Sequence, residues 1–345
     1  MHDSICRMRD AGQVYHVSRI PDQDFLKDMK LWHYSVVLDV GSYSLKLIQA
    51  CYKGGRFYLR RYAIAEASGL VSPSFLKPNV ADEEGFKGLI KDLFRRTGVR
   101  AREIFLLIPD LSLKFRFLEF QEVSGNREEI KELAKWRIRE LLPFPAEEAV
   151  LDYQEIPDGS RRLLCLIGRR DVIAQYERLV EETGHQARVL ESNSLSLYNF
   201  WEESLIAKQE KVCLLNLGYG EGTFIAVERG YPRFIRSFGL DGALREKGSS
   251  EGSSIGPYIE GVAREVSNSL SFLAEEGEYK AERLFLAGEA SSIENLDLLL
   301  TDELGLSVEG LDPTGIVSYS SSLKLDRDRL SSLSPALGAA TRGDM

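Results

Sequence analysis

The sequence contains the same strand–turn–strand pattern twice, and this repeat is the feature that most limits how the chain can fold. In the first copy, residues 35–48, an apolar β-branched run enters a glycine turn and an alternating strand follows. The second copy spans residues 211–225, and superposing the two without a gap pairs Asp39 with Asn216. In both copies a second turn and a third strand come next. We therefore predict a duplicated three-stranded meander.

Each glycine turn has the composition of an anion-binding turn. Gly41 can adopt a positive φ, so that consecutive backbone N–H groups point into one concavity. The hydroxyl groups of Ser42 and Ser44 and the ammonium group of Lys46 flank the turn, and Asp39 could hold a hydrated Mg²⁺. A single turn of this kind is more often part of an ordinary polar hairpin than an anion-binding site. Two copies that face each other predict a nucleotide clamp.

Composition narrows the class of protein. A chain of 345 residues is long enough for two domains, and its net charge of −9 argues against a nucleic-acid surface. Of the 4 cysteines, Cys51, Cys165 and Cys213 lie in apolar runs, and Cys6 is far from them; we expect buried free thiols in a reducing compartment. No apolar segment reaches the roughly 20 residues of a membrane helix, and residues 1–33 lack the apolar core of a signal peptide. The sequence predicts a cytoplasmic protein.

Strands and helices alternate through the chain, which indicates the α/β class. Residues 1–30 show no sustained periodicity and are expected to be poorly ordered, with Met29 as a candidate native start. Helical periodicity or capping signals predict helices at 83–97, 127–142, 171–182, 194–204, 258–276 and 334–342.

The helix at 127–142 carries a candidate contact for a partner. Asn126 and Glu129 form a capping box in the sequence. Trp136 falls almost opposite the predicted buried stripe, and an exposed tryptophan suggests a covering partner, although it could equally pack on a neighbouring strand. The predicted buried stripe consists of Ile130, Leu133, Ala134, Ile138 and Leu141.

The motifs together resemble those of the actin-like ATPase superfamily. Residues 39–46 (DVGSYSLK) resemble its first phosphate loop, residues 216–223 its second, and residues 286–291 its adenosine loop. Within the superfamily, residues 39–46 and 142–154 (LPFPAEEAVLDYQ) are similar to the type IV pilus assembly protein PilM family. The resemblance runs from about residue 30 to residue 342.

The resemblance implies an actin-like ATPase fold of two duplicated lobes with an inserted small α/β subdomain. The first lobe would span residues 31–205, with the inserted, partner-binding subdomain at about 99–168. The second lobe would span residues 206–345, with a terminal helix that returns toward the first.

The resemblance also implies that ATP and Mg²⁺ bind between the lobes, and that the subdomain helps to bind the N-terminal cytoplasmic tail of a PilN-like inner-membrane protein. The protein would then be cytoplasmic and peripheral at the inner membrane, with possible self-association and no nucleic-acid partner. We expect Asp39 to hold the metal through water and Asn216 to contribute weakly. The predicted nucleotide-binding residues are Gly41, Ser42, Ser44, Lys46, Gly218, Gly220, Thr223, Gly288 and Ala290.

Two departures from the family pattern bear on catalysis. Asn216 replaces the usual aspartate of the second phosphate loop, and Glu289 replaces the second glycine of the adenosine loop. Glu221 is the carboxylate best placed to compensate, but its position in a loop predicts that it is solvated. We therefore assign no catalytic residue and expect an adaptor that hydrolyses ATP slowly or not at all. The alternatives are an active ATPase or kinase and a filament-forming actin relative.

Overall fold

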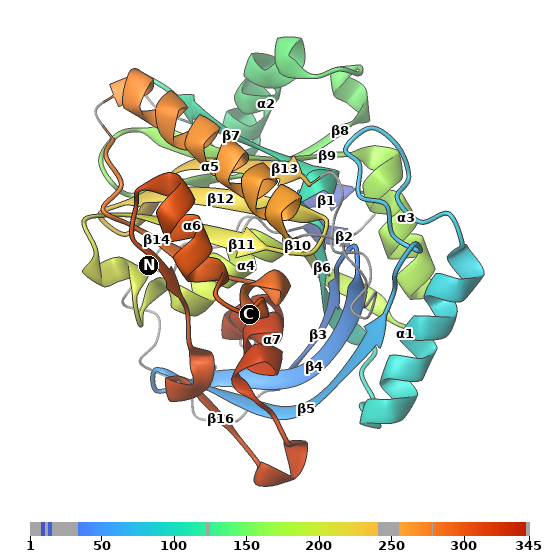
Figure 1. Ribbon diagram of the computed structural model, residues 1–345. Coiled ribbons are helices and arrows are strands. Elements are labelled where there is room, and N and C mark those ends of the chain that lie inside the picture. The colour runs from blue at the N-terminus through green and yellow to red at the C-terminus, as the bar shows by residue number, and fades with distance from the viewer. Residues whose placement is uncertain are drawn as a thin grey trace.

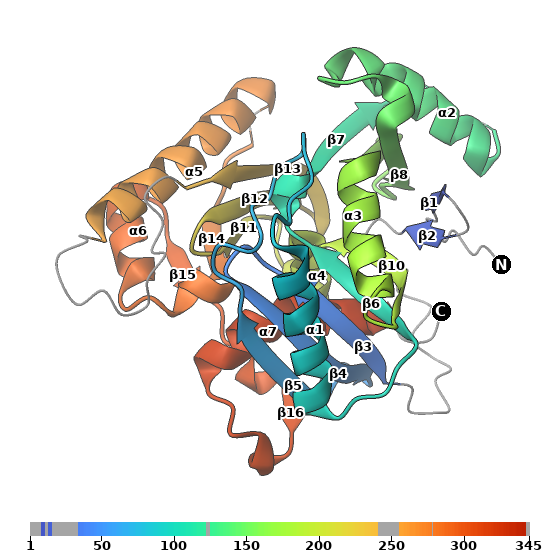
Figure 2. The same ribbon diagram turned by 90° about the vertical axis from the view of Figure 1, so that its right-hand side faces the viewer.

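The computed structural model describes residues 34–121, 125–240, 255–277 and 279–342, together with the backbone of the short antiparallel strands β1 (Met8–Asp10) and β2 (Gln13–Tyr15). Most of the stretch predicted to be poorly ordered lies outside the described residues. The chain forms two lobes side by side, and a smaller subdomain lies against both at one end (Figures 1 and 2).

The first lobe is built on a six-stranded sheet. Its central meander is antiparallel, because short turns join β3 to β4 and β4 to β5, while the strands added later pair in parallel. In spatial order the strands are β10 (Gln186–Ser192), β6 (Glu103–Ile108), β3 (Ser35–Val40), β4 (Ser44–Lys53), β5 (Arg56–Glu66) and β16 (Val317–Tyr319).

Helices cover both faces of this sheet. On one face lie α1 (Glu83–Thr97) and α3 (Arg170–Glu181), and on the other lie α4 (Asn193–Glu202) and α7 (Arg327–Ala339) (Figure 2). Helix α1 has the bounds that its periodicity predicts. Helix α7 begins seven residues before the predicted start at 334, because Asp326 caps it by accepting a hydrogen bond from the Arg329 amide; Pro335 lies inside the helix.

The second lobe repeats the plan of the first. Its meander and its parallel fourth strand follow the same order, and the register pairs Asn216 with Thr223 just as it pairs Asp39 with Lys46 in the first lobe. The predicted duplication is therefore confirmed. The strands are, in spatial order, β13 (Tyr231–Gly239), β12 (Glu221–Glu228), β11 (Lys211–Leu217), β14 (Arg283–Ala287) and β15 (Val308–Gly310), and the helices are α5 (Gly256–Gly277) and α6 (Leu296–Leu304).

The predicted small α/β subdomain is also present, between β6 and α3 in the chain. Helix α2 (Arg127–Ile138) lies over a sheet in which β9 (Arg162–Arg169) is flanked by β7 (Leu113–Glu119) and β8 (Ala149–Glu155). The capping box is formed as predicted, because the Asn126 side chain accepts from the Glu129 amide and the Glu129 side chain binds the Asn126 amide.

The predicted buried stripe of α2 is wrong at two positions. Leu133 and Leu141 are 42% and 56% exposed, while Ala134 and Ile138 are buried. A three-stranded sheet is narrow, so one turn-spaced pair of side chains is enough to cover it, and Leu141 lies in a 3₁₀ turn after the helix has ended. Trp136 is 57% exposed, which excludes the alternative that it packs on a neighbouring strand. Leu133, Trp136 and Leu141 are called the α2 patch below.

Cys51, Cys165 and Cys213 are buried free thiols, as expected, and Cys6 lies outside the described residues. Burial raises the pKa of Cys165 and Cys213 to about 12, so these thiols stay protonated and unreactive. None of the helices in the described parts of the chain is long and apolar enough to span a membrane.

Candidate functional site

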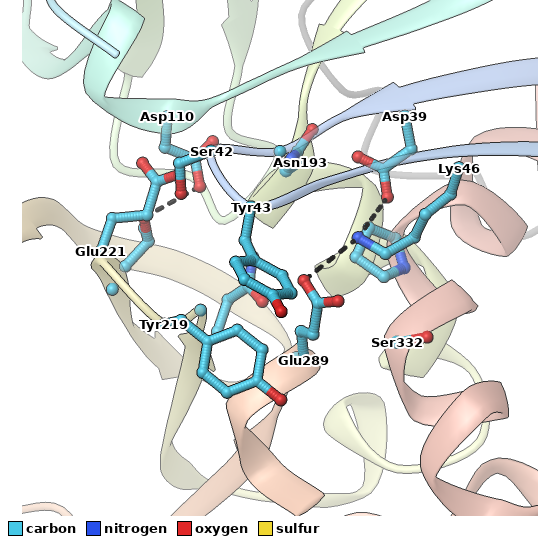
Figure 3. Close-up of a pocket in the computed structure, with 17 residues that line it drawn as sticks. Asp39, Ser42, Tyr43, Lys46, Asp110, Asn193, Tyr219, Glu221, Glu289 and Ser332 are labelled. Atoms are coloured by element: carbon cyan, nitrogen blue, oxygen red, sulfur yellow. Dashed lines mark hydrogen bonds and ion pairs between the residues drawn. The ribbon is translucent and has the colours of Figure 1, made fainter. Parts of the chain in front are cut away.

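A cleft lies where the two glycine turns meet between the lobes (Figure 3). The turn before β4 and the turn before β12 approach it from opposite sides, and the loop after β14 and helix α7 complete its walls. Most of the predicted nucleotide and metal residues line it. The lining comprises Asp39, Gly41, Ser42, Tyr43, Lys46, Asp110, Asn193, Asn216, Gly218, Tyr219, Glu221, Gly222, Thr223, Gly288, Glu289, Ser332 and Pro335.

The two turns have the same internal geometry. The Gly41 amide donates to the Ser44 carbonyl at 2.9 Å, and the Gly218 amide donates to the Glu221 carbonyl at 2.9 Å. The expectation that Gly41 adopts a positive φ is wrong. A glycine is favoured there by close approach instead, because a Cβ atom would lie 3.0 Å from the Ser44 carbonyl oxygen.

Lys46 is buried in the cleft between two carboxylates. Its Nζ lies 3.7 Å from Asp39 Oδ2 and 3.6 Å from Glu289 Oε2, and the residue is 5% exposed (Figure 3). Burial alone would lower the pKa of Lys46, but the charges of Glu289 and Asp39 outweigh it and raise this pKa. Lys46 is therefore a cation at neutral pH, as a phosphate ligand must be.

Asp39 is buried, and its carboxylate makes an ion pair with Lys46. It is 1% exposed, and neither of its carboxylate oxygens has a hydrogen-bond partner in the described chain. Burial raises the pKa of Asp39, and the nearby Lys46 charge acts in the opposite direction. No group of three or more metal-ligating side chains occurs among the described residues, so a cation here would be held largely through water and ligand oxygens.

The amide side chain of Asn216 is already engaged. Its Nδ2 donates to Ser194 Oγ at 2.9 Å, while its Oδ1 faces Gly288. Gly288 has a φ of +94°, and a Cβ atom there would lie 2.5 Å from Asn216 Oδ1 and 2.7 Å from the backbone of Leu217. Only glycine fits at this position, and the backbone of the loop therefore lies directly against the end of β11.

Asp110 is a site residue that the sequence analysis missed. It follows β6, is buried, and accepts hydrogen bonds from the hydroxyl groups of Ser192 and Ser194 and from Thr223 Oγ1 at 2.8 Å. Burial raises its pKa against the opposing effect of these donors. The hydroxyl group of Thr223, which is predicted to contact the nucleotide, is thus hydrogen-bonded to Asp110 in this structure. The feature of the sequence that could have identified Asp110 is its position as an acidic residue just after a buried strand.

Glu221 is not solvated, in contrast to the expectation. It is the first residue of β12 and lies half-buried in the cleft wall, close to Asp110 and Ser42 (Figure 3). Burial raises the pKa of Glu221 to about 7, and the charge of Asp110 adds to this effect. Beside it, Tyr43 of one lobe packs edge to face on Tyr219 of the other, with ring centroids 4.9 Å apart.

Three of the predicted nucleotide residues do not line the cleft. The Ser44 hydroxyl donates to Glu289, which itself lines the cleft, so Ser44 is next to the cleft but covered by that carboxylate; the Gly220 carbonyl accepts from the Leu240 amide. Ala290 is fully buried in the core of the second lobe. Trp136 is on helix α2, away from the cleft, with the Arg139 guanidinium 5.1 Å from its ring centroid.

Comparison with solved structures identifies the fold. No protein-family model matches the chain. A chain of the PilM–PilN type IV pilus biogenesis complex superposes with a TM-score of 0.77 at 21% sequence identity, covering 90% of this chain and 98% of that one. The ethanolamine utilization protein EutJ from Carboxydothermus hydrogenoformans superposes with a TM-score of 0.50 at 11% identity, covering 90% of each chain. The protein described here has the actin-like ATPase fold.

Proposed function

We propose that this protein is an ATP-binding adaptor of an inner-membrane complex that assembles a type IV pilus or a related secretion system. The observation that carries the proposal is the pair of glycine turns, closed by equivalent backbone hydrogen bonds, that face each other across a cleft containing a buried, charged lysine. The likeness to almost the full length of a chain from a PilM–PilN complex supports the pilus assignment.

The cleft residues suit a nucleotide bound with Mg²⁺. Lys46, Ser42 and the backbone of both turns would hold the phosphates, because charge-assisted and backbone N–H contacts are the usual phosphate ligands. Asp39, whose buried oxygens accept no hydrogen bond from the residues that the structure describes, would hold the metal through water, with Asn216 beside it. The metal would neutralise phosphate charge in a cleft that otherwise carries several carboxylates.

The lysine provides the first prediction. We expect Lys46→Ala to weaken ATP binding at least about tenfold, or about 1.4 kcal/mol, because it removes a charge-assisted contact to phosphate. Titration of a fluorescent ATP analogue with Mg²⁺ measures the effect. Lys77→Ala, which removes the same charge from an exposed loop, serves as the control and should bind as the wild type does. Unchanged affinity in Lys46→Ala would remove Lys46 from the site.

The partner would bind through the inserted subdomain. In this proposal the α2 patch contributes to holding the short N-terminal cytoplasmic tail of a PilN-like membrane protein, which would place the adaptor on the cytoplasmic side of the inner membrane. All three side chains of the patch are large, apolar and more than 40% exposed. Among the described residues, no other helix with its following turn has three such side chains.

Accordingly, we expect Trp136→Ala to reduce capture of the partner's tail about tenfold, since exposed tryptophans are frequent hot spots of binding energy. Pull-down with the immobilised tail at several protein concentrations measures the change in apparent affinity. Leu298→Ala on α6 is the matched control, because Leu298 is 62% exposed on the other lobe. If Trp136→Ala keeps its circular dichroism spectrum and full capture, the contact lies elsewhere.

Slow turnover is the third prediction. Asn216 cannot supply the negative charge that helps to hold Mg²⁺ and to orient an attacking water, and its amide is already bound to Ser194. Steady-state phosphate release from the wild type should therefore be well below about 1 s⁻¹, the slow end of ordinary enzymes. Asn216→Asp should release phosphate faster.

An active ATPase is the second candidate, and Glu221 favours it. A carboxylate in the cleft wall with a pKa near 7 has the properties of a general base at neutral pH. Rapid release by the wild type that is lost in Glu221→Gln would establish this function and overturn the adaptor proposal. Slow release unaffected by Glu221→Gln would support the adaptor.

A further inference from the structure

We propose that Glu289 occupies the phosphate position of the first glycine turn and competes there with the phosphates of an incoming nucleotide. The inference rests on the proposed function, because it concerns the same cleft. It assigns Glu289 as the residue that sets the affinity and selectivity of the cleft for phosphorylated ligands.

The contacts of the Glu289 carboxylate are those that a phosphate group would make. Ser44 Oγ donates to both of its oxygens, at 3.1 and 3.2 Å, and Lys46 Nζ lies 3.6 Å from Oε2. A hydroxyl and an ammonium group that converge on one anion form a phosphate-binding arrangement. In this structure, the anion is a side chain of the protein itself (Figure 3).

The backbone holds Glu289 in this position. Gly288, directly before it, has a φ of +94° and lies against the backbone of Leu217, so the loop cannot move toward β11. Glu289 then begins a 3₁₀ turn, Glu289–Ser292, and Ser291 Oγ of this turn is 3.0 Å from Ser331 Oγ of α7. The carboxylate therefore reaches from the second lobe to β4 of the first, and its side chain is only 21% exposed.

Charge makes the competition strong. Lys46 is the cation of the cleft lining, whereas Asp39, Asp110, Glu221 and Glu289 all contribute carboxyl groups. A nucleotide must displace Glu289 from Lys46 before a phosphate oxygen can take its place, and the displaced carboxylate then repels the phosphates at short range. Neutralising Glu289 releases Lys46 and removes the repulsion in a single step.

Two variants and two probes test the proposal. Glu289→Gln keeps the shape of the side chain and removes its charge, while Glu289→Gly removes the side chain. Glu294→Gln, on the exposed turn five residues further on, removes one charge that has no contact with Lys46. ATP with Mg²⁺ and adenosine are titrated against each variant and the wild type, and thermal unfolding verifies that each variant folds.

The expected result is a gain of at least tenfold in ATP affinity for Glu289→Gln and Glu289→Gly. Glu294→Gln should bind ATP as the wild type does, and adenosine binding should not change in any variant. A gain for ATP alone identifies competition with phosphate. An equal gain for adenosine would overturn the proposal, because Glu289 would then only hold the lobes together.

Failure of the inference and failure of the proposed function give different results. If the wild type binds ATP and Glu289→Gln binds it equally or more weakly, the inference is wrong and nucleotide binding stands; a weaker variant would place Glu289 on the ribose. If neither the wild type nor either Glu289 variant binds ATP, both the inference and the nucleotide-binding function are overturned.

Discussion

Replacing Gly338 with alanine is expected to lower the free energy of unfolding by about 3 kcal/mol or more, at the upper end for overpacking a core. Gly338 is in helix α7, where it crosses α4, and a Cβ atom there would overlap the carbonyl group of Ser196. It would also lie 3.1 Å from the Phe200 amide nitrogen. These backbone atoms of α4 cannot rotate out of the way as a side chain can, so α4 and α7 would have to move apart.

Gly88→Ala is the matched control for this experiment. Gly88 lies within helix α1, where a Cβ atom would meet nothing within 4 Å. The same substitution should here raise stability by about 0.5–1 kcal/mol, because alanine loses less backbone entropy than glycine in a helix. Chemical denaturation of both variants gives the comparison. A Gly338→Ala protein as stable as the wild type would show that α4 and α7 are less closely packed than described.

Arg342→Met is expected to cost about 3–5 kcal/mol, because it removes a guanidinium group that lies against a buried carboxylate. Arg342 Nη2 lies 3.1 Å from Glu191 Oε1, and the two side chains are 3% and 0% exposed. Glu191 is in β10 of the first lobe, whereas Arg342 is the last residue that the structure describes. The pair therefore fixes the end of the described chain to the first lobe.

A double-mutant cycle separates the pair from the packing around it. Glu191→Gln combined with Arg342→Met should recover most of the loss, because the buried carboxylate charge is removed together with the guanidinium group. The measurement is the midpoint of urea unfolding for both single variants, the double variant and the wild type. Equal losses in Arg342→Met and the double variant would assign the cost to packing and not to charge.

The fold could be predicted from the sequence where the determining contacts are local. The strand pairs Asp39–Lys46 and Asn216–Thr223 are joined by short turns, so the repeat in the sequence already defines their register. The capping box at Asn126 and the end of α1 at Gly98 depend on neighbouring residues in the same way. Both bounds of α1 and the start of α2 agree with the prediction, whereas α2 ends at Ile138, four residues before the predicted end at 142.

The parts of the site that could not be predicted depend on contacts across the chain. Asp110 is satisfied by Ser192, Ser194 and Thr223, which are distant in sequence and carry no pattern that links them. The sequence left the direction of Glu289 open, because only the packing of two lobes brings it to Ser44.

Divergence between the two duplicated turns makes the two walls of the cleft electrostatically different, because one carries the ammonium group of Lys46 and the other carries the carboxyl groups of Glu221 and Glu289. Asp39 faces Lys46 across β3 and β4, whereas the equivalent pair across β11 and β12 is Asn216 and Thr223. A symmetric cleft would attract an anion equally from both sides. Among the described residues of the lining, the ammonium group of Lys46 lies on one wall, so the electrostatic field has a direction, and an elongated anion enters with its charged end toward β4.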